Sequence, residues 1–391
     1  MLSQEMNDRL TRVGPGTPCG QLLRRYWQPV ALIQQLSDGR PMMRVRLLGE
    51  DLVLASLGNG EYACFAERCA HRGCSLRYGF LEEDGVRCPY HGWKYDFGGH
   101  CIEQPFEAEN SRYKARVKID AYPVQELCGI LFVYMGPSPA PLLPRWDVLV
   151  RRDGWRRVWT RVLDCNWFQI QENTVDTTHT HYLHARTLRE KGFPNGERDR
   201  AKAAYYERPI VSYDFKRCDW GIEKTCVYGG DHPGEEVRPP LIFPNILRIG
   251  DGIRDDILQW RVPVDDEHTR LIAMTFLPTA GMDADPVAET RVVRILGPEE
   301  GKDEFGDYDM LTFPTQDMMA WETQGRIADR TSEHLGASDR GIAMLRRMLA
   351  EQIDIVENGG EPMALVRDEA ANEIIKFEYP RAEHAYGFTG A

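Results

Sequence analysis

The sequence predicts an α+β protein in which a small all-β domain precedes a larger domain with an antiparallel sheet flanked by helices. From Met42 to about Met135, short apolar runs are separated by glycine and aspartate clusters, and helical periodicity is absent. Strand-like runs return over residues 203–277, and helical patterns follow from Gln316. The length of 391 residues is sufficient for two to three domains with their own cores.

Composition and charge exclude several classes of protein. Hydrophobic residues make up 42% and charged residues 28% of the chain, which are values typical of globular proteins. The 48 basic and 60 acidic residues give a net charge of −12, which disfavours a general nucleic-acid binder. No apolar stretch has the length of a signal peptide or a membrane span. We therefore expect a soluble cytoplasmic protein whose ten cysteines are mostly reduced thiols or metal ligands.

Turn-forming residues divide the chain into three parts. A short helix is expected over Gln4 to Arg12, before the turn-rich GPGTPCG segment. PSPAPLLP at residues 137–144 contains four prolines in eight residues, so it can neither enter a helix interior nor pair in a sheet. We therefore predict an N-terminal segment over residues 1–40 that packs on the larger domain, the small β-domain over 41–140, and the larger domain over 145–391.

The larger domain is predicted to begin with a helix and to end with one. The stretch from Asn166 to about Thr187 lacks glycine and proline, which favours a helix. Runs such as YYERPIVSYDF and TRLIAMTFL alternate as antiparallel strands do. A later helix is expected between a Ser338 cap and a Gly359 stop. Its apolar face consists of Ile342, Leu345, Leu349 and Ile353.

The strongest motif is CAHRGCSLRYGFLEEDGVRCPYHGW, which combines a Cys-x-His pair with a Cys-x-x-His pair. Cys69 and His71 form the first pair, and Cys88 and His91 follow after sixteen intervening residues. A structural zinc site is one interpretation, because zinc accepts two thiolates and two imidazoles. The usual zinc pattern keeps the two cysteines together, however, whereas each loop here contributes one of each type. Mixed pairs suit a two-iron cluster with one thiolate end and one imidazole end.

With Gly73 and Gly92, which let the loops close, these four residues resemble the Rieske [2Fe–2S] family. The resemblance implies that Cys69, His71, Cys88 and His91 bind the cluster. One branch of the family joins the two loops by a disulfide, but this chain has Cys74 at the first such position and Tyr90 at the second. The resemblance is therefore to the oxygenase or soluble ferredoxin branch, and we expect Cys74 to be a packed thiol and Trp93 to shield the cluster.

A second constellation lies in QENTVDTTHTHYLH, which contains three of the ten histidines. Asp176 and His179 are three residues apart and share a helix face. His179 and His184 are five apart, which is an awkward 140° step, so we expect the helix to end or distort near Tyr182. A polar helix with solvent-facing histidines is the alternative, and spacing alone does not choose among His179, His181 and His184.

Asn173, Asp176, His179 and His184 resemble the Asn-x-x-Asp-x-x-His-x-x-x-x-His motif of Rieske non-haem iron oxygenases. The resemblance implies that His179 and His184 bind a mononuclear Fe(II), and that His181 is a bystander. It also implies a carboxylate ligand on a late helix, where TQDMMAWETQG points to Asp317. Glu322 and Asp329, expected on the same helix, are the fallback candidates. Two histidines and one carboxylate leave positions open for dioxygen and substrate.

Asp176 has a different role in the family, where this carboxylate connects a cluster histidine of a neighbouring subunit to an iron-binding histidine. The resemblance therefore implies a ring of subunits, either a homotrimer or a hexamer formed by two stacked trimers. In such a ring, His71 or His91 of one chain would reach Asp176 and then His179 of the next. We expect a monomer to be nearly inactive.

The resemblance covers almost the whole chain and is closest to the phthalate-dioxygenase-like group of oxygenase alpha subunits. It implies an N-terminal Rieske domain, a C-terminal mononuclear iron domain, and hydroxylation of an aromatic, carboxylated substrate by cis-dihydroxylation, monooxygenation or O-demethylation. Electrons would come from a separate NAD(P)H-linked reductase of the flavin and ferredoxin type, because no GxGxxG lies between a strand and a helix. A Rieske electron-transfer protein without oxygenase activity and a zinc-stabilised binding module are the alternatives.

An acidic substrate would require a buried cation in the pocket, because an unpaired carboxylate in an apolar cavity is very unfavourable. Arg186, Arg208 and Arg248 lie in suitable regions, but we expect each of them to form a surface or structural ion pair. Trp167 and Phe168 precede the iron-ligand segment, and we expect them to belong to the core.

Overall fold

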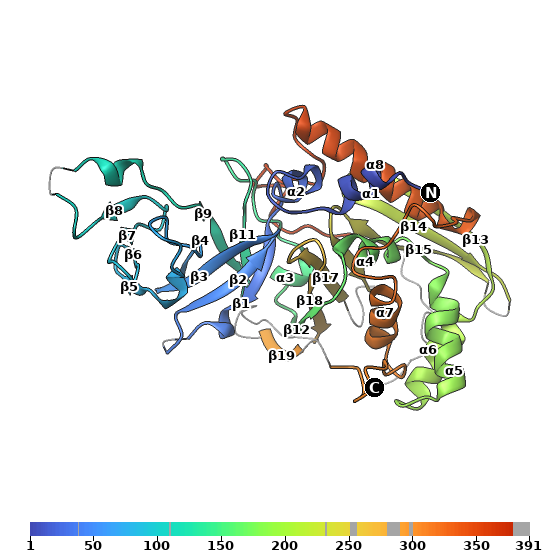
Figure 1. The fold of residues 1–391 in the computed structure, drawn as a ribbon. Coiled ribbons are helices and arrows are strands. Elements are labelled where there is room, and N and C mark those ends of the chain that lie inside the picture. Colours follow the sequence, from blue (N-terminus) through green and yellow to red (C-terminus); the bar gives the residue numbers. More distant parts are fainter. Residues whose placement is uncertain are drawn as a thin grey trace.

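A computed structural model describes residues 1–37, 39–108, 111–230, 233–250, 256–279, 290–296 and 300–377. A small β-rich lobe extends from a larger lobe in which helices cover a sheet (Figure 1). The small lobe is coloured in the blues of the first third of the chain, and the larger lobe contains most of the remainder. This arrangement confirms the predicted α+β fold class.

Three small sheets build the N-terminal lobe. Their strand orders are β1-β11-β10, β2-β3-β4-β9 and β5-β6-β7-β8. The strands are β1 (Gln28–Leu32), β2 (Met42–Leu47), β3 (Glu50–Gly58), β4 (Glu61–Ala66), β5 (Phe80–Glu82), β6 (Gly85–Arg87), β7 (Lys94–Tyr95), β8 (Cys101–Glu103), β9 (Ala121–Tyr122), β10 (Val124–Leu127) and β11 (Ile130–Val133). The sheet formed by β5 to β8 lies at the tip of the lobe, away from the larger lobe (Figure 1).

Tight turns set the register of the second sheet. Asn59 and Gly60 connect β3 to β4, and both have a positive φ, of 53° and 77°. Asn-Gly is favoured at such hairpins because both positions need the left-handed conformation. The alternating runs of this region therefore form antiparallel strands, as their period of two predicts.

An eight-stranded sheet forms the centre of the larger lobe, in the order β13-β14-β15-β16-β17-β18-β12-β19. All neighbours are antiparallel except β12 and β19. The strands are β12 (Gly154–Leu163), β13 (Ile210–Cys218), β14 (Gly221–Tyr228), β15 (Gly234–Ile242), β16 (Ile246–Ile249), β17 (Asp256–Pro263), β18 (Thr269–Pro278) and β19 (Thr290–Leu296). Buried apolar side chains of this sheet, including Leu258 and Met274, belong to the main core.

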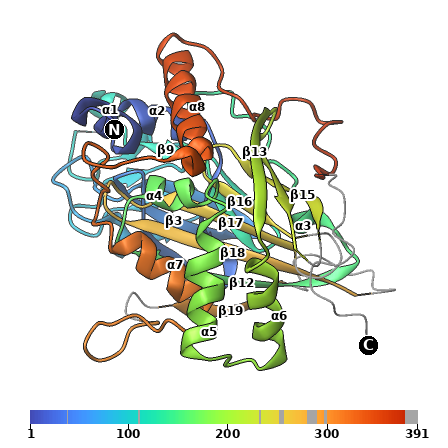
Figure 2. The ribbon, with the colours of Figure 1, turned by 90° about the vertical axis from the view of Figure 1, so that its right-hand side faces the viewer.

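Helices gather on one face of this sheet, where α4, α5, α6 and α7 lie in front of the strands (Figure 2). The α-helices are α1 (Gln4–Thr11), α2 (Pro18–Leu23), α3 (Asp147–Val150), α4 (Trp167–Asn173), α5 (Thr187–Lys191), α6 (Glu197–Tyr206), α7 (Phe313–Glu322) and α8 (Arg340–Glu357). A π-helix spans Thr180–Arg186. None of the helices in the described ranges combines the length and apolar character that crossing a bilayer requires.

The N-terminal segment lies against the C-terminal part of the larger lobe. Both α1 and α2 contact α8. The Asn7 amide donates to the backbone oxygen of Ala328 at 3.1 Å, and the Leu2 amide donates to Arg330 O at 2.9 Å. The domain boundaries near residues 40 and 140 stay predictions, because packing of this kind does not mark where one unit ends.

Three local predictions need correction. The expected helix from Asn166 to about Thr187 is interrupted, because α4 ends at Asn173 and helical geometry resumes near His179. The first residues of YYERPIVSYDF are helical, since Tyr205 and Tyr206 end α6 and Pro209 separates that helix from β13. The C-terminal helix α8 begins at Arg340 with Asp339 as its N-cap, rather than with Ser338.

Candidate metal centres

Two loops of the small lobe carry the four predicted cluster ligands, and both loops close in the same way. The Gly73 amide donates to the Cys69 carbonyl at 2.8 Å, and the Gly92 amide donates to the Cys88 carbonyl at 3.0 Å. Both glycines have a positive φ, of 72° and 76°, which favours glycine at these positions. The order Cys-x-x-x-Gly thus forms one tight turn twice, and each turn presents a thiol and an imidazole.

The two thiols are neighbours inside the lobe, and the two imidazoles are neighbours nearer its surface. Cys69 and Cys88 are buried, whereas His71 is exposed and His91 is partly exposed. The two imidazole rings lie 4.6 Å apart between centroids. Trp93 stacks on His71, with centroids 4.5 Å apart and planes within 7°. A two-iron cluster fits this arrangement, because its thiolate end would be inside the protein and its imidazole end near the surface.

Tyr95 supports the buried end of this site. Its hydroxyl lies 3.2 Å from Cys69 Sγ and accepts a hydrogen bond from the Ala70 amide at 3.1 Å. Burial raises the pKa of the Cys69 thiol, and the nearby Cys88 thiol raises it further. Two facing thiols of this kind become thiolates readily only when a metal offsets their charge.

No disulfide joins the two loops, as the sequence indicated. None of the ten cysteines forms a disulfide, and this includes the partly exposed Cys74. The corresponding position of the second loop is occupied by Tyr90, whose ring centroid lies 3.8 Å from that of His91. The second loop therefore carries an aromatic ring at the position where the other branch of the family has a disulfide-bonded cysteine.

The second site brings together His179, His184 and Asp317 from two distant segments. One potential ligand atom of each residue lies within 4.8 Å of the other two. The His179 and His184 rings are 5.3 Å apart and nearly perpendicular, and Asp317 Oδ1 lies 3.4 Å from His184 Nε2. Asp317 Oδ1 is buried without a hydrogen-bond partner among the described residues. A metal ion would satisfy this oxygen, so the donor set fits a two-histidine, one-carboxylate centre.

A π-helix explains how a step of five residues places both histidines at one point. Helical geometry begins at His179 and continues through the π-helix Thr180–Arg186. A π-helix closes its hydrogen bonds after five residues, so positions five apart in sequence lie on one face. The distortion expected near Tyr182 is therefore present, although the helix continues into α5 rather than ending there.

Gln316 and Phe313 hold the ring of His184. His184 Nδ1 lies 2.8 Å from Gln316 Oε1, and the Gln316 amide nitrogen donates to Met310 O at 2.8 Å. Since that bond directs Oε1 towards the imidazole, Nδ1 carries the proton and Nε2 is left facing Asp317. Phe313 stacks on the ring at 4.3 Å. Burial lowers the pKa of His184, which favours the neutral imidazole that a metal needs.

Asp176 is oriented by the turn between α4 and the π-helix. Its Oδ1 accepts from the Thr178 amide at 2.8 Å, the Thr178 hydroxyl at 2.9 Å and the His179 amide at 3.2 Å. Its Oδ2 lies 3.5 Å from His179 Nδ1. Burial opposes ionisation, but the interactions with His179 and the Thr178 donors lower the pKa of Asp176 to about 2. Asp176 is therefore an anion beside His179.

A solvent-open hollow adjoins this turn. Its lining consists of Asp176, Thr178, His179, His181, Tyr182 and Ile210. The imidazole of His181 faces Tyr206 O at 3.1 Å and is not part of the three-residue group. Asn173 contributes a backbone oxygen that accepts from the Asp176 amide at 3.2 Å. Asp176 and His179 thus border an accessible surface.

The two fallback carboxylates lie elsewhere. Glu322 accepts from the Asp164 amide at 3.0 Å and from the Tyr308 hydroxyl at 2.8 Å, so it is occupied in packing. Asp329 lies beyond the end of α7 and accepts from Thr331. The expectation that one helix carries all three carboxylates was therefore wrong for Asp329.

The three arginines considered for substrate binding form ion pairs, as expected. Arg186 pairs with Glu190 on the surface, and Arg208 pairs with Glu236 at 2.7 Å. Arg248 pairs with Asp147 and Asp256 in the interior. Trp167 and Phe168 are completely buried in the main core, which agrees with their predicted place.

Sequence reasoning missed Gln316, although it adjoins Asp317 in the motif. It also missed three cations of the large sheet, namely Lys224 on β14, Arg238 on β15 and Arg261 on β17. Many sequences contain an amide next to an acid, and many contain single cations in strands. The local sequence therefore gave no indication that these residues belong to a site.

Comparisons with known proteins identify relatives of this chain. Residues 26–123 match the family model described as Rieske [2Fe-2S] domain, and residues 301–379 match the model described as LigXa C-terminal domain like. The 5,5'-dehydrodivanillate O-demethylase oxygenase subunit of Sphingobium sp. (strain NBRC 103272 / SYK-6) is 39% identical, over 96% of this chain and 86% of that relative. The phthalate 4,5-dioxygenase oxygenase subunit of Pseudomonas putida is 31% identical, over 97% and 92%.

A solved structure agrees at the level of the fold. The terminal oxygenase of carbazole 1,9a-dioxygenase from Novosphingobium sp. KA1 superposes with a TM-score of 0.60 and 22% identity, over 89% of this chain and 98% of that one. With the extended relatives above 30% identity, the chain belongs to the Rieske non-haem iron oxygenases as an oxygenase alpha subunit, with a [2Fe–2S] cluster and a mononuclear iron as its cofactors.

Proposed function

We propose that this chain oxygenates an aromatic, carboxylated substrate at an iron held by His179, His184 and Asp317. The observation that carries the proposal is the convergence of three donor atoms within 4.8 Å, one of which belongs to His179, a residue that also lines a solvent-open hollow. Three ligands on one side leave positions for dioxygen and substrate, which a closed four-ligand site does not. When bound, the iron supplies the oxidising chemistry.

The protein's own part in this reaction is positioning and exclusion of water. Gln316 fixes the ring of His184, and Phe313 covers one face of it. Tyr206 lies 5.8 Å from Phe313 and extends this apolar cover. This rigid, apolar cover favours productive turnover because it keeps water away from the His184 side of the site.

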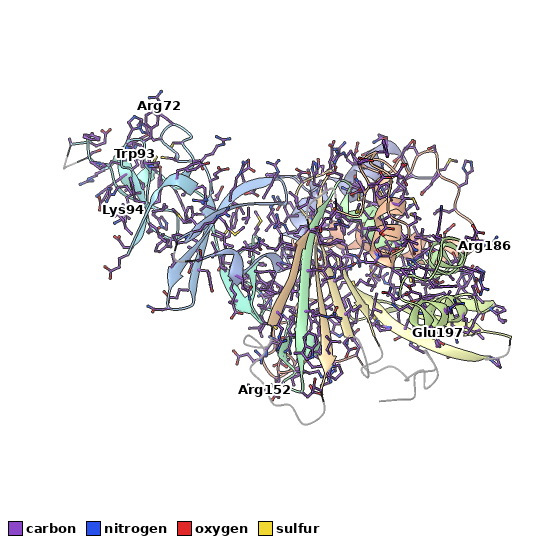
Figure 3. All side chains as sticks on the ribbon, turned by 90° about the horizontal axis from the view of Figure 1, so that it is seen from below. Arg72, Trp93, Lys94, Arg152, Arg186 and Glu197 are labelled. Carbon is purple, nitrogen blue, oxygen red and sulfur yellow. The ribbon has the colours of Figure 1, made fainter. Side chains whose placement is uncertain are left out.

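We further propose that Cys69, His71, Cys88 and His91 hold the cluster, and that electrons pass between subunits. Figure 3 places Arg72 and Trp93, at the cluster site, and Arg186, at the end of the π-helix, at opposite ends of the molecule. A cluster this far from the iron of its own chain needs a neighbouring chain. A ring of three subunits, or two stacked rings, would bring His71 or His91 to Asp176 of the next subunit.

The surface around the cluster supports such a contact. Tyr90 and Tyr113 are more than half exposed, and both contact residues of the cluster site. Arg72 lies over the ring of Tyr90 at 5.4 Å. Exposed aromatic and arginine side chains of this kind are enriched at protein interfaces.

The electron source is proposed to be a separate NAD(P)H-linked reductase of the flavin and ferredoxin type, working in the cytoplasm where that nucleotide is reduced. Solved neighbours include a complex between the oxygenase and the ferredoxin of carbazole 1,9a-dioxygenase. Among the possible reactions, O-demethylation of an aryl methyl ether has the most support, because the relative at 39% identity is the oxygenase subunit of an O-demethylase.

Metal analysis and oxygen uptake test this proposal. We expect three irons per chain, a Rieske visible spectrum, and oxygen consumption that depends on reductase and on an aromatic acid or ether. Product analysis then separates demethylation from ring hydroxylation. Two irons per chain without substrate-stimulated oxygen uptake would instead indicate an electron-transfer protein, and zinc without colour would indicate a binding module.

A further inference from the structure

Two cations face each other across neighbouring strands beneath the iron site. Lys224 on β14 is the register partner of Arg238 on β15. Lys224 is buried and Arg238 is partly buried. Like charges directly opposite each other destabilise a sheet, and burial increases that penalty. A pair of this kind therefore needs a compensating anion.

In the described part of the chain, no carboxylate forms an ion pair with either of them. The Lys224 ammonium donates to Thr174 O at 2.8 Å, and the Arg238 guanidinium donates to the Tyr228 hydroxyl. No ion pair within 4.0 Å involves these two cations among the described residues. Most of the donor capacity of Lys224 and Arg238 is thus left for another acceptor.

Several other buried arginines of the larger lobe have carboxylate partners, although Arg156 and Arg261 bond to carbonyl and amide oxygens instead. Arg330 and Arg346 both bind Glu172, and Arg248 binds Asp256. Even the neighbouring Glu236, on the same strand as Arg238, is paired with Arg208. Among the described residues, Lys224 and Arg238 have no carboxylate partner and also face each other, so the pair indicates a place for an anionic ligand.

The pair lies close to the iron-binding segment. Thr174, which accepts from Lys224, is the C-cap of α4 and precedes Asp176 by two residues. Tyr206, close enough to Arg238 to act on its charge, lies 6.2 Å from the His184 ring. Buried polar atoms around Lys224 and α4 also lack partners in the described structure, namely Gln171 Nε2, Thr174 Oγ1, Thr177 Oγ1 and Arg261 Nε.

We propose that Lys224 and Arg238 form a subsite that binds the carboxylate of the aromatic substrate and so orients its ring towards His179 and His184. The proposal rests on the oxygenase function and adds the residues that select the substrate class. Burial, together with a smaller contribution from Arg238, lowers the pKa of Lys224 to about 7. A bound carboxylate would restore its charge. A planar guanidinium and an ammonium together can satisfy both carboxylate oxygens.

The test compares two ligands of the same shape and different charge, 3-phenoxybenzoate and 3-phenoxybenzamide. Binding to the complete holoenzyme is measured by anaerobic calorimetry, so no turnover is needed. We expect wild type to bind the benzoate at least about tenfold more tightly than the amide, because a charged hydrogen bond contributes about 1.5 kcal/mol or more. Arg238→Gln should weaken benzoate binding about 10- to 100-fold and leave amide binding within about twofold.

Controls separate this subsite from general damage. Arg186→Gln removes an exposed arginine paired with Glu190 and should change neither affinity. Arg238→Lys should recover part of the benzoate affinity, and an unchanged Rieske spectrum shows an intact fold. If Arg238→Gln does not fold, the subsite is still tested by Lys224→Gln and by the affinities of the wild-type protein for the two ligands.

Two results would overturn the subsite. Equal affinity of wild type for benzoate and amide would do so, as would an equal loss of both ligands in Arg238→Gln. Oxygen uptake with the amide would then show that the oxygenase function stands without the subsite. Failure of every aromatic compound to bind or to stimulate oxygen uptake would overturn both proposals.

Discussion

In the small lobe, the four candidate ligands come from two turns that lie sixteen residues apart, and each turn is closed by its own backbone hydrogen bonds. In the larger lobe, the candidate ligands come from the π-helix and from α7, and more than a hundred residues separate His184 from Asp317. The first site is exposed at its imidazole end, whereas His184 is almost completely buried. Local turns can therefore build an electron-transfer site, but a site that handles substrate needs long-range packing.

Asp317→Ala should show the largest effect, because it removes a candidate iron ligand of the larger lobe and leaves the smaller lobe unchanged. We expect the iron content to fall from three to two per chain, the Rieske spectrum to remain, and oxygen uptake to be lost. Metal analysis and visible spectroscopy measure this directly. Asp329→Ala, at an exposed carboxylate beyond α7, is the matched control and should keep three irons. Retention of the third iron in Asp317→Ala would remove this residue from the site.

Asp176→Asn tests whether the two regions communicate through this residue. The amide oxygen can still accept from Thr178 and His179, so both metals should stay bound. Loss of the charge beside His179 should slow turnover by about 100-fold, as for other groups that orient metal ligands. Electron transfer from the reduced cluster is measured by stopped-flow, as the rate of cluster reoxidation in the presence of substrate. A wild-type rate would contradict the route between subunits.

Gln316→Leu should weaken the mononuclear site more gently than loss of a ligand. Without the acceptor for Nδ1, the ring of His184 loses its fixed orientation, and iron affinity should fall about 10- to 100-fold. Anaerobic competition with a chelator measures the affinity, and the Rieske spectrum reports on the other region. Gln324→Leu, an exposed glutamine just beyond α7, should have no effect. An unchanged affinity in Gln316→Leu would mean that packing by Phe313 alone orients the ring.

The smallest effect concerns pH. The pKa of Lys224 is lowered to about 7 by burial and by Arg238 and Arg261, while Cys226 and Asp176 act in the opposite direction. Above this pH the free protein holds a neutral amine, so its attraction for an anion declines as the pH rises. Affinity for 3-phenoxybenzoate should fall about tenfold between pH 7 and pH 9 in wild type. The fall should be much smaller in Lys224→Met, and an equal slope in both proteins would assign the effect to another group.

Much of the small lobe could be predicted from the sequence. Cys-x-His and Cys-x-x-His, each followed by glycine, define turns whose hydrogen bonds span only a few residues. The distortion near Tyr182 followed from the five-residue step between His179 and His184. Asp317 could be selected only through a family resemblance, because any acid on a late helix satisfies the same local pattern. The helical position of Tyr205 and Tyr206 was missed, since aromatic pairs also favour strands.

By itself, the sequence determined the kinds of donor atom and the turns that present them, because turn geometry depends on neighbouring residues. Only the tertiary structure decided which carboxylate reaches His184, which amide holds its ring, and which cations face each other without a carboxylate partner among the described residues. Those contacts join α4, α7, β14 and β15, and they depend on how these elements pack across the sheet. Packing of that kind is a property of the whole fold, so it cannot be predicted from any short segment of the chain.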